Sequence, residues 1–256
     1  MHWAYHIGYG TPAYKNVASY ATKPHFWDDI IKPSNESEVF IMNKNLTEMV
    51  FILDRSGSMS GLETDTIGGY NSLLEKQKKE EGEAVVTTVL FDDKYDMICD
   101  HADINKIPPM TEKEYYARGC TALLDAIGKT INHVGNRHKY APDSEVPSKT
   151  MVVIITDGYE NASREFDLNK VKHMIEHQKE KYNWEFLFLG ANIDAVQTAE
   201  TFGINADRAV TYHADSVGTR TNFEAVSETV ACMRAEHPID KSWKDKIENY
   251  MKKKEK

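Results

Sequence analysis

The stretch that decides the fold is Met49-Val50-Phe51-Ile52-Leu53-Asp54-Arg55-Ser56-Gly57-Ser58-Met59. Its opening run is apolar throughout, which is typical of a strand covered on both faces of a parallel sheet. A carboxylate, Asp54, follows at once, and two hydroxyl side chains, Ser56 and Ser58, stand at alternate positions after it. Carboxylate and hydroxyl oxygens on one tight loop are hard ligands of the kind that Mg²⁺ prefers. The segment therefore predicts a metal site at the end of a strand.

Two later segments supply further oxygen atoms. Thr121 lies in Arg118-Gly119-Cys120-Thr121-Ala122, just before a helical pattern, and Asp157 follows the apolar strand pattern of residues 151–155. A serine-rich loop taken alone has a plainer explanation, since short polar side chains often satisfy the backbone amides of a turn. Thr121 and Asp157, in this order and context, favour the metal site over that explanation.

Three other polar residues lie close to these segments in the sequence. Asp125 comes one helical turn after Thr121, where a carboxylate interacts favourably with the helix N-terminus. Glu160 and Asn161 follow Asp157 and are candidates for the rim of a ligand site.

Asp54-x-Ser56-x-Ser58, followed by Thr121 and Asp157, resembles the metal-ion-dependent adhesion site (MIDAS) of the von Willebrand factor A (VWA) domain family. The resemblance spans about residues 46–235 and includes the strands before the first and third pieces and the helix after the second. It implies that Ser56, Ser58 and Thr121 contact the metal directly. It also implies that Asp54 and Asp157 act largely through bound water.

The resemblance further implies a function and a cofactor. An ion held mainly by neutral hydroxyls keeps much of its positive charge and leaves a position for an incoming carboxylate. We therefore expect a non-catalytic protein-interaction module that binds a Glu or Asp side chain of a partner protein through Mg²⁺, with Mn²⁺ or Ca²⁺ as alternative ions. Cys120 stands where the family more often has glycine, which places a thiol beside the metal.

Two other functions fit parts of the sequence. Asp54, after a strand and beside a metal, suits the nucleophile of a Mg²⁺-dependent phosphoester hydrolase. The haloacid-dehalogenase pattern, however, places a second aspartate where Ser56 stands. An RNA-associated scaffold is the other alternative, and the net charge of −9 disfavours it because phosphate binding needs clustered positive charge. We therefore expect no nucleic-acid partner. His173 and His177, four residues apart on a predicted helix, are flanked by Lys and Glu and indicate a solvated face rather than a metal site.

The cysteines and the hydropathy pattern bear on the compartment. Cys99, Cys120 and Cys232 are widely separated and have neither the spacing of a metal-binding pair nor the density of a disulfide framework. No stretch has the length of a membrane span, and the N-terminus lacks the pattern of a signal peptide. We expect a cytoplasmic protein with no membrane partner.

Apolar runs alternate with amphipathic helical patterns along the chain. Residues 49–53, 85–91, 151–155 and 186–189 are predicted central strands, residues 95–100 an antiparallel edge strand, and residues 208–213 a weaker last strand. This alternation predicts a doubly wound α/β domain, with a mostly parallel central sheet and helices on both faces, as in the Rossmann-like VWA fold. Such sheets bind ligands beyond the carboxyl ends of their strands, which is where Asp54 and Asp157 fall.

A chain of 256 residues suits one domain with extensions. We expect an N-terminal extension over residues 1–45, the VWA-like domain over 46–236, and a C-terminal helix with a basic tail over 237–256. As an alternative, Met42 is the natural start and the preceding residues are leader sequence, because Met42 opens only a few residues before the first strand. In the C-terminal segment, Asp240 is a predicted helix cap after Pro238. The stripe of Trp243, Ile247, Tyr250 and Met251 packs on the domain or, alternatively, docks a partner.

Overall fold

The computed structural model describes residues 43–254. The possible start at Met42 and most of the predicted extension 1–45 lie outside the described residues. None of the helices within residues 43–254 has the length and apolar character needed to cross a membrane.

Six strands form one sheet in the order β3-β2-β1-β4-β5-β6. They are β1 (Asn43–Asp54), β2 (Glu83–Phe91), β3 (Tyr95–Asp103), β4 (Pro147–Thr156), β5 (Glu185–Ala191) and β6 (Ala209–Tyr212). Every neighbouring pair is parallel except β2 and β3, so β3 is the antiparallel edge strand that the sequence predicts. The strand order reverses between β1 and β4, and this makes their carboxyl ends the switch point of a doubly wound sheet.

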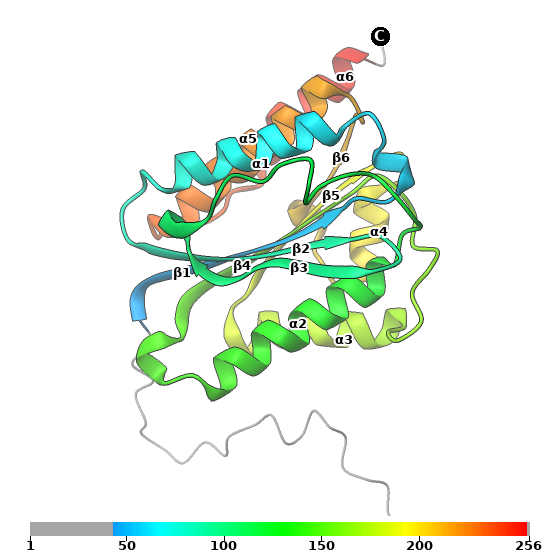
Figure 1. Cartoon of the computed structure of the whole chain (residues 1–256). Helices are drawn as coiled ribbons and strands as arrows, with labels where there is room; N and C mark the ends of the chain where they lie inside the picture. Colours follow the sequence, from blue (N-terminus) through cyan, green and yellow to red (C-terminus); the bar gives the residue numbers. More distant parts are fainter. Residues whose placement is uncertain (1–42, 255–256) are drawn as a thin grey trace, which may run out of the picture. The chain divides into compact units, whose positions relative to one another are not determined.

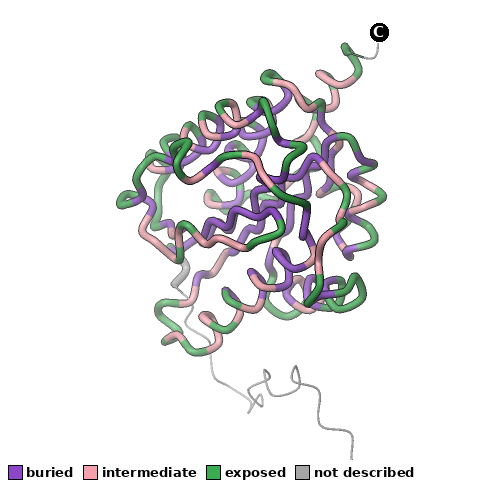
Figure 2. The backbone as a smooth tube through the Cα atoms, turned by 45° about the vertical axis from the view of Figure 1, so that its right-hand side comes forward, coloured by how far each residue is buried: buried purple, intermediate pink, exposed green. Residues whose placement is uncertain are grey.

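Helices cover both faces of this sheet, as predicted. They are α1 (Glu63–Gln77), α2 (Leu123–Tyr140), α3 (Leu168–Tyr182), α4 (Ala195–Thr201), α5 (Ser216–Arg234) and α6 (Asp245–Lys254). Figure 1 shows α1, α5 and α6 on one face and α2 and α3 on the other. The strands at the centre are buried and the outward turns of the helices are exposed (Figure 2). Met49, Val50, Phe51 and Ile52 of β1 are 0% exposed, which accounts for the uninterrupted apolar run in the sequence.

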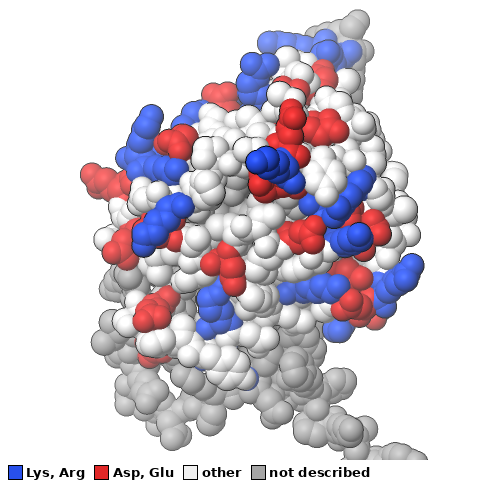
Figure 3. All heavy atoms as spheres, in the orientation of Figure 1, with Lys and Arg blue, Asp and Glu red and all other residues white. Residues whose placement is uncertain are grey.

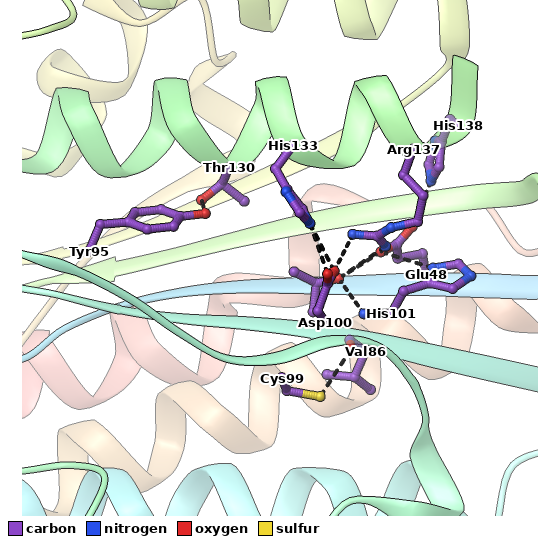
Figure 4. A network of polar contacts seen from close by, with 11 residues as sticks. Glu48, Val86, Tyr95, Cys99, Asp100, His101, Thr130, His133, Arg137 and His138 are labelled. Atoms are coloured by element: carbon purple, nitrogen blue, oxygen red, sulfur yellow. Dashed lines mark hydrogen bonds and ion pairs between the residues drawn. The ribbon is translucent and has the colours of Figure 1, made fainter. Parts of the chain in front are cut away.

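One charged side chain, Glu48, lies within this buried strand and is also 0% exposed. Its carboxylate accepts hydrogen bonds from Thr87 Oγ1 and Arg137 Nη1, each at 2.8 Å, and lies 2.6 Å from His138 Nε2. Arg137 also contacts Asp100 of the edge strand (Figure 4). A buried carboxylate is tolerated only when it is paired and hydrogen-bonded. The network therefore joins the C-terminal end of α2 to β1, β2 and β3.

The C-terminal helix packs back on the domain. Ile247 is 1% exposed within the core, and the indole Nε1 of Trp243 donates to the carbonyl of Asp207 at 2.8 Å. Asp240 is a cap, but of the short 3-10 helix η6 (Lys241–Lys244) that precedes α6: its side chain accepts a hydrogen bond from Ser242 N at 2.8 Å. The predicted boundary at residue 236 therefore does not separate two packing units.

Candidate metal centre

Asp54 ends β1 at the point where this strand lies beside β4. Its Oδ1 accepts a hydrogen bond from Ser56 N at 2.7 Å, and its Oδ2 accepts one from Thr156 Oγ1 at 2.6 Å. The Tyr115 hydroxyl donates to the backbone carbonyl of Asp54. Asp54 is 1% exposed. One lone pair on each carboxylate oxygen is already used by the protein, so Asp54 is better placed to support a metal site than to enclose the ion.

Ser58 lies within hydrogen-bond distance of both Ser56 and Asp157. Ser56 Oγ is 3.1 Å from Ser58 Oγ, and Ser58 Oγ donates to Asp157 Oδ1 at 2.5 Å. Thr121 reaches the same place: a methyl group placed on Gly158 would lie 3.4 Å from Ser58 Oγ and 3.5 Å from Thr121 Oγ1. The structure thus brings the hydroxyls of the predicted site together with its carboxylates.

Backbone contacts hold the Thr121 loop against the Asp54 loop. Arg118 N donates to the Arg55 carbonyl at 2.9 Å, and Gly57 N donates to the Gly119 carbonyl at 3.1 Å. Gly119 has a φ of +67°, and a Cβ there would lie 2.1 Å from Asp93 Oδ1. Only glycine suits this close, left-handed position. Loops that are far apart in sequence therefore meet through fixed main-chain geometry.

The neighbouring acidic residues are used by the protein itself. Asp125, in the first turn of α2, accepts hydrogen bonds from the backbone amides of Arg164, Glu165 and Phe166 at 2.9–3.0 Å. It ties a loop to the helix in addition to lying at the helix N-terminus. These three hydrogen bonds lower the pKa of Asp125 against the effect of burial, which would raise it.

Glu160 and Asn161, the candidates for the ligand rim, both make contacts within their own and neighbouring loops. Glu160 Oε2 accepts from Leu124 N at 2.8 Å, and Glu160 Oε1 accepts from Ser163 N at 2.7 Å. Asn161 Oδ1 accepts from Thr121 N at 2.9 Å. Asn161 is exposed and lies beside Thr121, where its side-chain oxygen holds the Thr121 loop in place.

Sequence reasoning missed several residues that shape the site. Thr156 and Tyr115 contact Asp54 directly, and Asn192 at the end of β5 donates through Nδ2 to the carbonyl of Asp157 at 3.4 Å. The sequence does single out Thr156, because it is the polar residue that ends an otherwise apolar run directly before Asp157. Tyr115 has no such signal, because it belongs to a long loop without period.

Arg55, between Asp54 and Ser56, supports the loop from behind. Its side chain is 3% exposed, its Nε donates to Asp92 Oδ2 at 2.9 Å, and its guanidinium also contacts Asp96. Arg118 contacts the same two carboxylates, Asp92 at 2.6 Å and Asp96 at 3.1 Å. The charges of this cluster balance, and it fixes the loop that carries both serines.

The electrostatics of the site favour a cation. Burial raises the pKa of Asp54 to about 6, the charge of Asp157 adds to this rise, and hydrogen bonds from Thr156 and Ser56 oppose it. Burial likewise raises the pKa of Asp157. A cation would stabilise the charged form of both desolvated carboxylates.

The donor set also indicates which type of ion fits. Residues 43–254 contain no group of three or more His, Cys, Asp or Glu side chains placed to hold a metal. A metal in this site thus depends on the hydroxyls of Ser56, Ser58 and Thr121 as well as on the carboxylates. An all-oxygen set of this kind fits Mg²⁺, Mn²⁺ or Ca²⁺ better than an ion that prefers sulfur.

No protein-family model matches the sequence, and no curated protein matches it. Solved structures do match. The pilus adhesin SpaC from Lactobacillus rhamnosus GG, in an open conformation, has a TM-score of 0.56 and 11% identity, over 74% of this chain and 30% of the adhesin. Proximal thread matrix protein 1 from the mussel byssus, with a zinc-occupied MIDAS motif, has a TM-score of 0.50 and 14% identity, over 75% of this chain and 47% of the matrix protein.

A von Willebrand factor type A protein from Catenulispora acidiphila also matches, with a TM-score of 0.49 and 14% identity, over 74% of this chain and 43% of that protein. The chain spans less than half the length of each of these structures. Identities this low concern the fold alone. The strand order, the helices on both faces and the likenesses to SpaC and to the mussel protein together show that the chain has the Rossmann-like α/β fold of the VWA type.

Proposed function

We propose that this chain is a metal-dependent protein-interaction module. Ser56, Ser58 and Thr121 would hold a divalent cation directly, and Asp54 and Asp157 would support it, largely through water. The observation that carries the proposal is the meeting of three hydroxyls and two buried carboxylates at the switch point of the sheet. A bound cation would supply positive charge that attracts a carboxylate of a partner.

The protein presents this site on an accessible edge. Ser58 is exposed, as are Gly57, Cys120 and Tyr159 around it, whereas Ser56 and Thr121 are buried. An incoming Asp or Glu side chain would therefore approach from the side of Ser58. Tyr159, 63% exposed, offers an aromatic contact of the kind that contributes strongly at protein interfaces.

A non-catalytic role is part of the proposal. SpaC is a pilus adhesin and the mussel protein is a matrix protein, so two proteins of this fold have structural or adhesive functions in their names. In this chain Ser56 occupies the position at which a phosphoryl-transfer site of the dehalogenase type has its acid/base aspartate, and its Oγ contacts Ser58. Acidic and basic side chains are interspersed over the face seen in Figure 3, which supports a protein partner over a nucleic acid.

We place this function in the cytoplasm and name Mg²⁺ as the ion, with Mn²⁺ and Ca²⁺ as alternatives. Cys99, Cys120 and Cys232 are all free thiols, and two of them are exposed. A reducing compartment keeps such thiols free. Mg²⁺ suits a site of few protein oxygens because it retains several of its own waters.

The first experiment measures metal binding by calorimetry with Mg²⁺, Mn²⁺ and Ca²⁺ in separate titrations. We expect binding to the native protein and none to Asp54→Ala. Ser60→Ala is the matched control, because Ser60 is an exposed serine on the same loop that is not part of the site. If the native protein binds none of these ions, the site is only a well-ordered turn.

The second experiment tests the acidic partner. The immobilised native protein, Asp54→Ala and Ser60→Ala are each exposed to cell extract in Mg²⁺ and in EDTA. A partner should be retained by the native protein and by Ser60→Ala, in Mg²⁺ only. Replacing one Asp or Glu of that partner by Asn or Gln should then abolish its retention. If the partner is still retained after each of its Asp and Glu side chains has been replaced, the carboxylate mechanism is wrong.

A further inference from the structure

Buried polar atoms without a protein partner gather between α1, α5 and the end of β6. They are the hydroxyls of Thr219 and Tyr212 and both side-chain amide atoms of Asn222, none of which has a hydrogen-bond partner within residues 43–254. The buried Thr66 hydroxyl belongs to the same group and lies next to the Tyr115 hydroxyl. Each of these residues is 1–2% exposed. Buried polar groups are nearly always hydrogen-bonded, so a cluster of this kind needs an explanation.

The packing of α1 on α5 places Thr66, Thr219 and Asn222 in one layer. Gly69 lies against Phe223, since a Cβ on Gly69 would meet that ring at 2.3 Å, and Gln77 Nε2 donates to the Ser227 carbonyl at 2.8 Å. The two helices therefore run in the same direction. Thr66 comes about one turn before Gly69, and Thr219 and Asn222 come just before Phe223. Thr66 on one helix thus faces Thr219 and Asn222 on the other.

Two tyrosines close this layer on the side of the sheet. Tyr115 lies beside Thr66 and Tyr212, both of which influence its pKa, and its hydroxyl donates to the Asp54 carbonyl. Burial raises the pKa of Tyr212, and the charges of Asp157 and Asp54 raise it further. Tyr212 therefore remains a neutral hydroxyl that both donates and accepts hydrogen bonds. The cluster lies directly behind the metal centre.

The chemistry of the cluster selects its occupant. Asn222 offers two donors and an acceptor, and each hydroxyl offers a donor and acceptor lone pairs. A metal cation would meet no carboxylate among these groups to neutralise its charge, and an anion would meet no positive side chain among them. Water both donates and accepts, and buried water typically makes about three hydrogen bonds to groups that are otherwise unsatisfied.

We propose that Thr66, Tyr212, Thr219 and Asn222 form a binding site for ordered water, which bridges α5 to α1 and to β6. The water would hold the first turns of α5 against the carboxyl edge of the sheet. This inference does not rest on the proposed function, because the groups involved contact no metal. It is tested in EDTA for that reason.

The sign of a hydroxyl deletion separates a hydrated layer from a dry one. Tyr212→Phe removes one oxygen and no packing. In a dry layer it would remove an unsatisfied buried group and raise the melting temperature. In a hydrated layer it breaks a hydrogen bond to water, and we expect the melting temperature to fall by about 2–4 °C. Tyr70→Phe is the matched control, because Tyr70 is 1% exposed and its hydroxyl lies 2.7 Å from Thr88 Oγ1.

Asn222→Leu gives a second, independent reading. It keeps the size of the side chain but removes both unsatisfied atoms, so it should also lower the melting temperature if water is bound. A high-resolution crystal structure of the native protein should show at least one ordered water within hydrogen-bond distance of the Tyr212 hydroxyl or the Asn222 amide. A melting temperature that is unchanged or raised in Tyr212→Phe, while Tyr70→Phe lowers it, overturns the proposal. A crystal structure that shows no water density in this layer also overturns the proposal.

Discussion

Ser58 Oγ donates a hydrogen bond to Asp157 Oδ1 at 2.5 Å across 99 positions of sequence. Ser58 follows β1 and Asp157 follows β4, and these strands are parallel neighbours with Leu53 opposite Ile155. The contact therefore follows from strand order, since the two carboxyl ends meet at the switch point. It also shows that the two acidic strand ends share one site.

The Thr121 hydroxyl is the most specific test of the donor set. Thr121→Ala should lower the affinity for Mg²⁺ by about 10- to 100-fold, because a site with few protein oxygens loses one of them. Thr121→Ser keeps the hydroxyl and should keep most of the affinity. Isothermal titration calorimetry compares the two variants. If Thr121→Ala and Thr121→Ser bind Mg²⁺ with equal affinity, the Thr121 hydroxyl is not a ligand of the ion.

Without metal, the Asp54 carboxylate should cost stability rather than supply it. Its pKa is raised to about 6 by burial and by the charge of Asp157, so at neutral pH the carboxylate is charged in both states but carries that charge at a higher free energy in the folded protein. Asp54→Asn should therefore stabilise the protein in EDTA by about 1–3 kcal/mol at pH 7. In saturating Mg²⁺ the order should reverse, because only the native protein gains from binding. Urea unfolding in both buffers measures this, and a large loss of stability in EDTA would contradict it.

Arg55 should matter more for stability than its position on a loop suggests. Arg55→Met leaves Asp92, which is 0% exposed, with the partly exposed Arg118 and the backbone amide of Lys94 as its remaining partners. Removing one member of a buried ion pair costs about 3–5 kcal/mol. Arg118→Met, whose arginine is 30% exposed, should cost clearly less. Chemical denaturation of both variants decides the point, and equal losses would show that burial of Arg55 is not the cause.

Acid should weaken the fold through Glu48. Burial alone would raise the pKa of Glu48, but the close His101 ring, the hydrogen bond with His138 and the charges of His138 and Arg137 hold it well below 4.5. A lowered carboxyl pKa contributes stability that is fully present above pH 4.5, the ordinary value, and is lost as the pH falls below it. Glu48→Gln should have a lower free energy of unfolding than the native protein at pH 7. Between pH 4.5 and pH 2 its free energy of unfolding should fall less steeply than that of the native protein. Urea unfolding across this range tests it; parallel pH profiles for the two proteins would rule Glu48 out.

The C-terminal helix should stabilise the domain. Ile247→Ala should cost about 2–4 kcal/mol, because Ile247 is 1% exposed and its removal leaves a cavity. Val217→Ala is a suitable control at 44% exposure and should change stability by less than about 0.5 kcal/mol. Thermal and urea unfolding of both variants are the measurements. If Ile247→Ala proved neutral, the helix would be free to dock elsewhere.

The sequence by itself determined the strands, the fold class and the residues that meet at the candidate metal centre. Its apolar runs are long enough to predict buried parallel strands, and the carboxyl ends of such strands meet whatever the loops between them do. Asp54 and Asp157 could thus be placed together before their contacts were known.

Only the tertiary structure decided which neighbours serve the site. Thr156 and Tyr115 contact Asp54, Arg55 pairs with Asp92 and Asp96, and Asp125 accepts loop amides. The buried polar layer of Thr66, Tyr212, Thr219 and Asn222 likewise appears only once α1 and α5 pack together. The physical reason is the same in each case. These contacts depend on loop paths and helix register, which follow from the packing of the whole domain and leave no periodic signal in the sequence.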